Sequence, residues 1–342
     1  MDKVRWGVIG CGGIARKRTI PGFLESKDAK CIAIMDTVAD CLQEVGDQFG
    51  IAKRYVSVDA ILADEEIEAV YIATPVRFHK EHVFAAAKAG KHILVEKPMA
   101  LTSKDAEEMQ AFCDACGVKL GVGFMMRFHG VHEQMKQIIS NGGIGEIVSA
   151  YAVFNTRSPI VPNKWRQTKS SSGGGAMMDM GIHCIDLLHY MTDLKPVELT
   201  ALCGNQIFQY PDVEDAGTAV MRMSNGALFT VQANFNIPTN AGGCSIVIMG
   251  TNGSLTAQNT VGQTSTGSLY YIDCNRTPAE PVLLSYDTGN MYAKEIDAFS
   301  NAIRSDTIPP VCAEDCILTQ KVIEAIYQSN ENGACIKMEE SK

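Results

Sequence analysis

Apolar and polar positions follow two alternating periods over residues 1–124 of the chain. Short apolar runs, typical of buried strands, occupy residues 4–9, 30–35, 69–73, 92–95 and 119–124. Segments with a helical spacing of apolar residues lie near residues 14–25, 38–49, 58–63, 78–89 and 103–116. Thr102 followed by Asp105 has the spacing of a capping box, and Gly90 and Gly117 stand where helix ends are expected. Continuous apolar strands alternating with helices predict a doubly wound parallel sheet.

The pattern changes after Arg127. A helix is expected at 132–140 and a strand at 147–154, and β-rich segments then repeat from residue 197 to residue 271. Asn225-Gly226 and Asn252-Gly253 separate such segments, and Asn-Gly between alternating runs is a strong hairpin signal. We therefore expect two domains, residues 1–124 and 125–342. The second is predicted to be an α/β domain with a large, mostly antiparallel open sheet, one face of which is covered by helices near 177–191, 292–305 and 312–330.

The composition is that of a two-domain globular protein. With 342 residues, 46% of them apolar and 20% charged, the chain is long enough for two packed cores. The net charge of −9 argues against a nucleic-acid partner, because nucleic-acid surfaces are basic. No run approaches eighteen consecutive apolar residues, which argues against a membrane partner, and the first strand begins too early for a signal peptide. A cytoplasmic location is expected.

A glycine-rich turn follows the first strand. Gly10 and Gly12, with Ala15 in the third position, form the pattern G-x-G-x-x-A where a strand runs into a helix. Gly10 allows a tight turn, Gly12 lets the backbone approach a pyrophosphate, and Ala15 allows close helix–sheet packing. A helix N-terminus also offers free N–H groups to phosphate. The residues of this turn predicted to bind a dinucleotide are Gly10, Gly12, Gly13, Ile14 and Ala15.

Asp36 ends the second strand, 24 residues beyond Gly12. A carboxylate at this place accepts hydrogen bonds from both ribose hydroxyls and repels a 2′-phosphate. Thr37 follows it, where an arginine would favour the phosphorylated cofactor. The sequence therefore predicts NAD as the cofactor. The basic residues 16–18 either lie near the phosphates or form a solvated helix face, and the second interpretation is preferred.

Two later strands also end in polar segments, Thr74-Pro75 and Glu96-Lys97-Pro98. Because the carboxyl ends of parallel strands line the ligand crevice, Thr74, Pro75 and Glu96 are expected to contact the cofactor. His79 is expected either to cap the following helix or to touch the cofactor. Lys97 is expected to contact the cofactor, to hydrogen-bond a substrate hydroxyl and to stabilise an alkoxide. The alternative is a purely structural pair of Glu96 and Lys97.

Asp179 and His183 are four residues apart in the segment that follows Gly173-Gly174-Gly175. This spacing places both side chains on one face of a helix. Asp186 and His189 extend the same stripe, either as partners of each other or as further metal ligands. The metal interpretation is disfavoured, because the H-E-x-x-H arrangement is absent and hydride transfer needs no metal.

Together these segments resemble the Gfo/Idh/MocA oxidoreductases, the family named after glucose–fructose oxidoreductase and inositol dehydrogenase. The resemblance covers nearly the whole chain and rests on the turn at 10–15, Asp36, Ala73-Thr74-Pro75, Glu96-Lys97-Pro98, Met126-Arg127-Phe128, Trp165-Arg166 and residues 173–186. It implies a Rossmann domain followed by an α/β domain whose open sheet forms a homo-oligomer, a dimer, tetramer or higher. It also implies that Lys97, Asp179 and His183 form the catalytic group and that Lys97-Pro98 is a cis peptide.

The chain departs from the family pattern at Val76, where asparagine usually follows Thr-Pro, and it lacks the export signal of glucose–fructose oxidoreductase. Candidate substrate contacts beyond the catalytic group are Arg127, Trp165 and Arg166, since tryptophan can stack on a sugar ring. The expected substrate is a small polyol, sugar or glycoside.

In the expected mechanism, His183 takes the proton of a secondary alcohol while hydride moves to nicotinamide. Lys97 stabilises charge on the oxygen, and Asp179 holds a neighbouring hydroxyl or orients the histidine. Three alternatives stay open: a glycoside 3-oxidase, an NAD-dependent glycoside-cleaving enzyme working through a 3-keto intermediate, and a non-catalytic NAD-binding regulator. The regulator is disfavoured because the lysine–histidine set is present.

Overall fold

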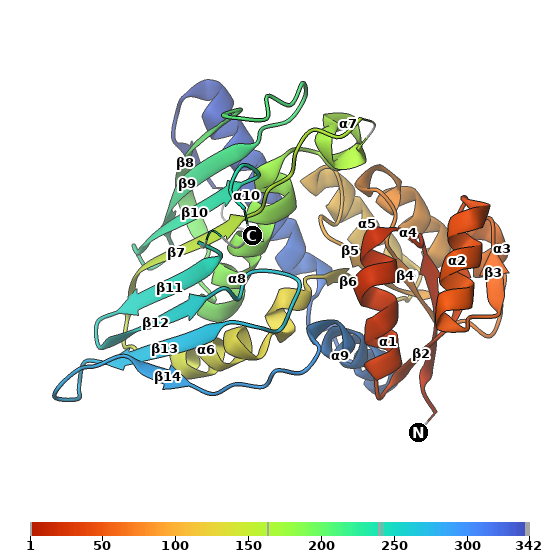
Figure 1. Ribbon diagram of the computed structural model, residues 1–342, viewed down its shortest axis with the longest axis horizontal. Coiled ribbons are helices and arrows are strands. Elements are labelled where there is room, and N and C mark those ends of the chain that lie inside the picture. Colours follow the sequence, from red (N-terminus) through yellow and green to blue (C-terminus); the bar gives the residue numbers. More distant parts are fainter. Residues whose placement is uncertain (1, 163, 239–240, 242, 339–342) are drawn as a thin grey trace. The chain divides into compact units, whose positions relative to one another are not determined.

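The computed structural model describes residues 2–162, 164–238, 241 and 243–338, and Figure 1 labels its elements. The chain divides into two compact units. The first comprises Met1–Met125 and Asn290–Leu318, and the second comprises Met126–Gly289 and Thr319–Lys342. The division expected from the sequence, 1–124 and 125–342, differs from these units in the returning segment 290–318.

In the described part of the first unit, six parallel strands form one sheet in the order β3-β2-β1-β4-β5-β6. The strands are β1 (Val4–Ile9), β2 (Ala29–Met35), β3 (Lys53–Tyr55), β4 (Ala69–Ile72), β5 (His92–Glu96) and β6 (Leu120–Gly123). The helical segments between them are η1 (Ala15–Thr19), α1 (Ile20–Glu25), α2 (Ala39–Phe49), α3 (Val58–Leu62), η2 (Val76–Phe78), α4 (His79–Lys88) and α5 (Ser103–Ala115). The strand order reverses between β1 and β4, the place where doubly wound sheets bind ligands. The predicted doubly wound sheet is confirmed.

Local signals in the sequence account for several of these elements. The central strands are buried on both faces, as their continuous apolar runs require. The side chain of Thr102 accepts a hydrogen bond from the backbone N–H of Asp105, which confirms the predicted cap of α5. Gly90 and Gly117 follow α4 and α5 with positive φ angles, as expected at helix ends.

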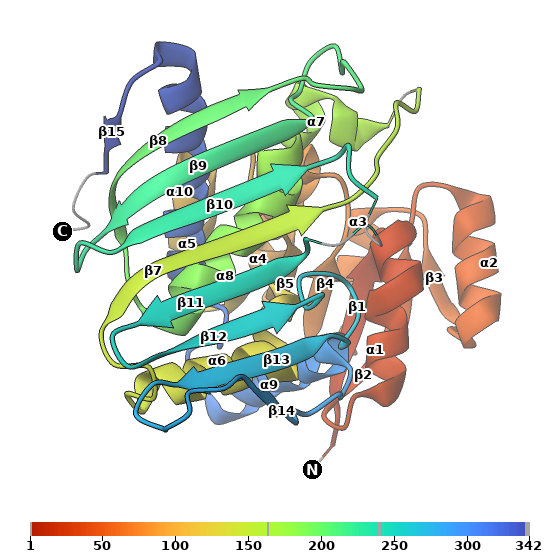
Figure 2. The ribbon, with the colours of Figure 1, turned by 60° about the vertical axis from the view of Figure 1, so that its left-hand side comes forward.

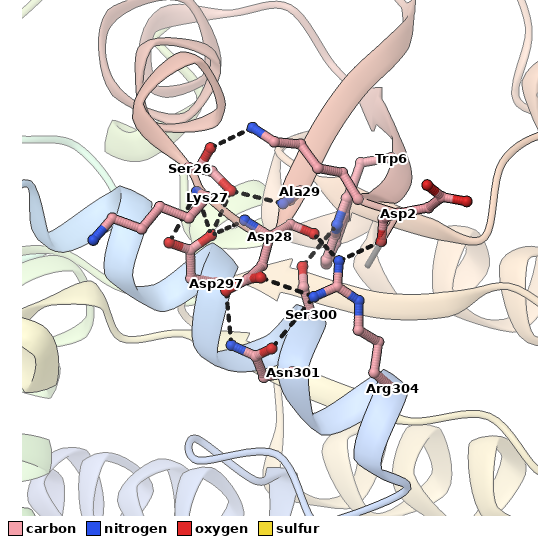
Figure 3. A network of polar contacts seen from close by, with 11 residues as sticks. Asp2, Trp6, Ser26, Lys27, Asp28, Ala29, Asp297, Ser300, Asn301 and Arg304 are labelled. Atoms are coloured by element: carbon pink, nitrogen blue, oxygen red, sulfur yellow. Dashed lines mark hydrogen bonds and ion pairs between the residues drawn. The ribbon is translucent and has the colours of Figure 1, made fainter.

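Helix α9 (Met291–Ser305) belongs to the first unit, and the prediction that it covers the second sheet is wrong. Figure 3 shows its polar contacts with Trp6 and with the segment before β2. The ring of Trp6 in β1 packs against Phe299 at a centroid distance of 5.5 Å, and its indole N–H donates to Ser300 at 3.1 Å. Asp297 accepts the backbone N–H groups of Lys27 and Asp28, which precede β2. The apolar face of α9 therefore closes the core of the first sheet.

In the described part of the second unit, nine strands form a sheet in the order β14-β13-β12-β11-β7-β10-β9-β8-β15. All neighbours are antiparallel except β7 and β10. The strands are β7 (Ile147–Asn155), β8 (Pro196–Gly204), β9 (Ala216–Met223), β10 (Leu228–Asn234), β11 (Ser245–Gly250), β12 (Gly253–Gln258), β13 (Ser268–Asp273), β14 (Val282–Leu284) and β15 (Ile336–Lys337). The predicted Asn-Gly turns join β9 to β10 and β11 to β12. The mostly antiparallel second sheet is confirmed.

One face of the second sheet is covered by helices, which lie behind it in Figure 2. The helical segments of this unit are α6 (Gly130–Ser140), η4 (Trp165–Gln167), α7 (Lys169–Ser172), η5 (Met177–Gly181), α8 (Ile182–Thr192) and the later part of α10 (Ala313–Asn332); η3 (Met125–Phe128) begins at the unit boundary. On the other face, exposed apolar side chains recur along neighbouring strands, including Tyr151, Leu202, Val220 and Leu228. Among the described helices, none combines the length and the hydropathy that a membrane span requires.

Candidate active site

The turn after β1 is shaped by the end of β4. Gly10 has a φ of +95°, and a Cβ atom there would lie 3.0 Å from the carbonyl carbon of Ala73. A side chain at this position would therefore meet both a strained backbone and a neighbouring strand. Ala15 is fully buried and lets the following helix lie close to the sheet. Two of the predicted constraints of the glycine pattern are thus present in the structure.

The backbone next to this turn is open. A Cβ atom on Gly12 or Gly13 would have no neighbour within 4 Å, so a ligand can approach the peptide groups directly. One carboxylate oxygen of Asp36 accepts the N–H of Cys11 at 2.8 Å, and the other accepts the N–H of Val38 at 2.9 Å. Asp36 therefore fixes the turn, and each oxygen keeps acceptor capacity for a ribose hydroxyl. These residues fit a dinucleotide.

Arg16 turns away from the open backbone and towards α2. Its guanidinium donates to Glu44 at 2.8 Å and to Gln48 at 2.9 Å, and the ion pair is half exposed. These contacts support the interpretation of this helix face as solvated.

His79 joins the ends of two strands. Its Nε2 lies 2.9 Å from the carbonyl oxygen of Thr74, and its Nδ1 lies 3.1 Å from that of Pro98. Burial lowers the pKa of His79 to about 4, although the carbonyl contacts oppose the shift. Both ring nitrogens face protein carbonyls, so this geometry supports a bracing role for His79 between the two strand ends. Val76, next to these residues, is buried and apolar.

Glu96 accepts a hydrogen bond from Tyr71 of β4. The phenol donates to Glu96 Oε1 at 2.6 Å, and the other oxygen accepts the backbone N–H of Lys97 at 3.2 Å. Glu96 is buried, and the peptide between Lys97 and Pro98 is cis, as the resemblance implied. The carboxylate thus contacts the backbone from which the Lys97 side chain extends.

In the second unit, Asp179 and His183 lie on one continuous helical segment that opens with a π-turn, η5, and continues as α8. Single π-turns inside helices occur frequently at functional sites. His183 is 3% exposed and lies 6.0 Å, ring to ring, from Phe154, whereas the side chain of Asp179 is 27% exposed. The segment therefore presents a partly accessible carboxylate and a largely enclosed imidazole.

Asp186 and His189 both contact groups elsewhere in the chain. Asp186 is fully buried and accepts hydrogen bonds from Nε and Nη2 of Arg127, whereas Nδ1 of His189 lies 3.2 Å from the carbonyl oxygen of Leu194. The side chain of Arg127 is only 4% exposed. Arg127 thus neutralises a buried carboxylate one turn after His183, and its expected place in the wall of the substrate site stays a prediction.

Trp165 and Arg166 lie beside Asp179. The guanidinium of Arg166 stacks 4.3 Å above the Trp165 ring, and its Nε lies 3.8 Å from Asp179 Oδ1. Lys164, which the sequence did not single out, donates to Ser158 at 3.0 Å. Burial and the neighbouring Arg166 lower the pKa of Lys164, while Asp179 opposes this shift. The surroundings of Asp179 are therefore cationic and partly aromatic, which suits a polyhydroxylated ring.

Sequence reasoning also missed Glu214 and Tyr327, which contact the turn at Gly174-Gly175. A cavity of about 260 Å³ lies beside this turn, and its lining includes Lys169, Asn205 and Asn330 but neither Asp179 nor His183. Within the described part of the chain, no group of three or more His, Cys, Asp or Glu side chains is arranged to hold a metal ion. No local motif could have identified Glu214, because its contacts lie about 40 residues away along the chain.

Known families match both halves of the chain. A model described as an oxidoreductase family with an NAD-binding Rossmann fold matches residues 4–124. A model described as the GFO/IDH/MocA C-terminal domain matches residues 132–256.

Full-length relatives and a solved structure agree with these matches. An uncharacterized oxidoreductase of Rhizobium meliloti is 30% identical over 97% of this chain and 98% of its own. The 1,5-anhydro-D-fructose reductase of Ensifer adhaerens is 28% identical over 98% of each chain, and the D-glucoside 3-dehydrogenase of Escherichia coli is 25% identical over 98% and 97%. The crystal structure of aldose-aldose oxidoreductase from Caulobacter crescentus, complexed with glycerol, superposes with a TM-score of 0.92 at 25% identity, covering 98% of this chain and all of that one.

Proposed function

The chain belongs to the GFO/IDH/MocA oxidoreductase family, and from that premise we propose that it transfers a hydride between NAD and a secondary alcohol of a sugar, glycoside or cyclitol ring. The observation that carries the proposal is the open backbone at Gly12 and Gly13 beside the carboxylate of Asp36. Of the residues predicted from the sequence, those we propose as cofactor contacts are Gly10, Gly12, Gly13, Ile14, Ala15, Asp36, Thr74, Pro75 and Lys97. A bound nicotinamide ring would accept or return the hydride at C4.

NAD is proposed over NADP because of Asp36. Its carboxylate is fixed by two backbone N–H groups, so it cannot swing away from a 2′-phosphate without releasing the turn. Arg16, the nearest basic residue of the following helix, is engaged by Glu44. The fixed carboxylate of Asp36 would therefore repel a 2′-phosphate on the ribose.

The proposed reaction uses three side chains. His183 takes the proton of the substrate hydroxyl as a general base, the commonest role of a catalytic imidazole. Lys97 donates to the same oxygen and stabilises its developing negative charge. Asp179, partly exposed beside Arg166 and Trp165, accepts a hydrogen bond from a neighbouring hydroxyl and fixes the ring.

A substrate screen tests this proposal. The purified protein is incubated with NAD⁺ and a panel of inositols, hexoses, O-glycosides and C-glycosides, and NADH absorbance is followed. A matching screen runs the reduction with NADH and keto-sugars, including 1,5-anhydro-D-fructose, since one relative carries that activity in its name. Turnover of at least one ring alcohol or ketone supports the proposal, and the absence of turnover in both directions contradicts it.

A second candidate is oxidation of a glycoside at C3, either as a 3-oxidase or as the first step of glycoside cleavage. The full-length similarity to a D-glucoside 3-dehydrogenase favours it. The two routes differ in their stoichiometry: a dehydrogenase accumulates one NADH per oxidised ring, whereas a cleaving enzyme releases the aglycone without net NADH. A non-catalytic regulator is disfavoured because Lys97, Asp179 and His183 are all present.

We also propose that a second copy of the chain covers the open face of the second sheet. Tyr151, Val220 and Leu228 are each between 40% and 50% exposed there, on adjacent strands β7, β9 and β10. Apolar area of this kind on a broad sheet favours self-association. Light scattering of the wild type and of Val220→Glu tests the proposal: the variant should shift to a smaller species, and an unchanged oligomer would contradict the assignment of this face.

A further inference from the structure

Three successive backbone N–H groups at the start of the helix that carries Asp179 and His183 donate to one residue, Glu214. Its carboxylate accepts the N–H of Gly175 at 2.9 Å and that of Met177 at 2.9 Å, and its carbonyl oxygen accepts the N–H of Ala176 at 3.1 Å. Such N–H groups have no partner within the helix and need one from outside. Glu214, which precedes β9, supplies all three.

Tyr327 of α10 completes this arrangement. Its hydroxyl donates to Glu214 Oε1 at 2.8 Å, so three donors converge on the two carboxylate oxygens. Burial raises the pKa of Tyr327 well above its usual range, which keeps the phenol a donor. Burial also raises the pKa of Glu214, whereas the hydrogen bonds from Met177, Tyr327 and Gly175 lower it. Acceptance from three donors is the bonding pattern of an ionised carboxylate.

The glycines of this turn are explained by the same two residues. A Cβ atom on Gly175 would lie 1.8 Å from the carbonyl oxygen of Glu214, and one on Gly174 would lie 2.1 Å from the hydroxyl of Tyr327. Both distances are far below a van der Waals contact. The small-residue run therefore lets Glu214 and Tyr327 approach the helix start closely.

The contact continues directly to Asp179. The carbonyl oxygen of Gly175 accepts the backbone N–H of Asp179 at 2.9 Å, while the N–H of Gly175 is held by Glu214. One residue, Gly175, thus joins the clamp, defined as Glu214 and Tyr327, to the residue proposed to hold the substrate. His183 follows one turn later on the same helical segment.

We propose that Glu214, supported by Tyr327, is a positioning residue: it fixes the pitch and the π-turn of the helix start so that Asp179 and His183 meet the substrate in a reactive geometry. This inference rests on the proposed function. A displacement of about 1 Å at a reacting group can lower the rate by about 100-fold, so even a small change in this turn is measurable.

The test compares Glu214→Gln with a matched control, Asp215→Asn. The neighbouring carboxylate of Asp215 also accepts three hydrogen bonds, from the backbone N–H groups of Gln206, Ile207 and Phe208, in a loop that carries no proposed catalytic residue. In Glu214→Gln the new NH₂ group faces a donor, which displaces the helix start. Its kcat should fall about 10- to 100-fold, with an unchanged Kd for NAD. Asp215→Asn should lose thermal stability but keep its kcat.

Two further variants make the result decisive. Tyr327→Phe, which leaves the carboxylate in place, should fold and show a smaller loss of kcat, so the test survives if Glu214→Gln fails to fold. Adding Glu214→Gln to His183→Ala should cause no further loss, because Glu214 acts through the helix. Equal losses of kcat in Glu214→Gln and Asp215→Asn, or full kcat in both Glu214→Gln and Tyr327→Phe, would overturn the inference. A fully active His183→Ala enzyme would instead overturn the proposed function.

Discussion

Within the second unit, the guanidinium of Arg127 donates hydrogen bonds from two of its nitrogens to the carboxylate of Asp186. Nη2 donates to Oδ1 at 2.6 Å, and Nε lies 3.1 Å from both oxygens. Both side chains are almost fully buried, and Tyr190 lies under the guanidinium with its ring 5.3 Å away. The pair closes the turn of α8 that follows His183, so it contributes to the position of the helix without needing to contact the substrate.

Breaking this pair should destabilise the protein more than replacing it. Asp186→Leu leaves a buried, unbalanced guanidinium and should lower the free energy of unfolding by about 3–5 kcal/mol. The double variant Arg127→Met/Asp186→Leu removes both charges and should recover most of that loss. Urea unfolding followed by circular dichroism measures both. A double variant as unstable as Asp186→Leu alone would show that the guanidinium has a second essential partner.

Asp36 should determine the choice of cofactor. Asp36→Asn keeps the size of the side chain and an acceptor for the turn but removes the charge that repels a 2′-phosphate. We expect NAD binding to weaken by about 10-fold, as for loss of a charged hydrogen-bond acceptor, and NADP binding to improve. Asp40→Asn, which removes an exposed carboxylate at the start of α2, is the matched control. If both variants change the NAD/NADP ratio of Kd values equally, residues other than Asp36 recognise the ribose.

His132 should make the protein sensitive to acid. Its Nδ1 lies 2.8 Å from the carbonyl oxygen of Met126, which can only accept, so Nδ1 carries the proton and Nε2 accepts from Thr260 at 3.0 Å. Burial, with the nearby His129, lowers the pKa of His132 to about 3. The unfolded ring titrates near 6.5. The unfolded state therefore binds more protons between these values, and stability falls as the pH drops below about 6.5.

The non-titrating variant His132→Asn isolates this contribution. Its amide can still donate to Met126, but it loses the contact with Thr260, so it should be less stable than the wild type at pH 8. Between pH 6 and pH 4 the wild type should lose about 1.4 kcal/mol more per pH unit than the variant. The comparison is necessary because His79 shifts in the same direction. Parallel stability curves for the two proteins would contradict the assignment.

The sequence predicted those features whose cause is local. The apolar run of β1 has the bounds Val4–Ile9 in both the prediction and the structure, and the caps of α5 follow from single side chains. The three-residue strand β3, Lys53–Tyr55, was not predicted because it is short, polar and at the sheet edge. Helix α9 has a clear apolar face, but that face does not reveal which sheet it will cover.

The candidate site likewise contains residues that local sequence predicts and residues that it does not. The glycine turn and Asp36 could be predicted because a strand end and a helix start define their geometry within a few residues. The partner of Asp186 lies 59 residues away along the chain, and that of Gly175 lies 39 residues away. Such pairs are set by packing of distant elements, so the partner of Arg127 was not predicted and Glu214 was overlooked.

The most direct test of the proposed chemistry is a kinetic cycle with His183→Ala, Lys97→Ala and the double variant on the best substrate. If His183 is the base, His183→Ala should lower kcat by roughly 10²- to 10⁴-fold, with little change in the Kd for NAD, because Gly12 and Asp36 lie in the other unit. Lys97→Ala should show a comparable loss. The double variant should fall well short of the product of the two losses, as residues that act as a unit do. Thermal unfolding recorded in parallel separates lost chemistry from lost structure. A folded His183→Ala protein that keeps most of its turnover would contradict the account.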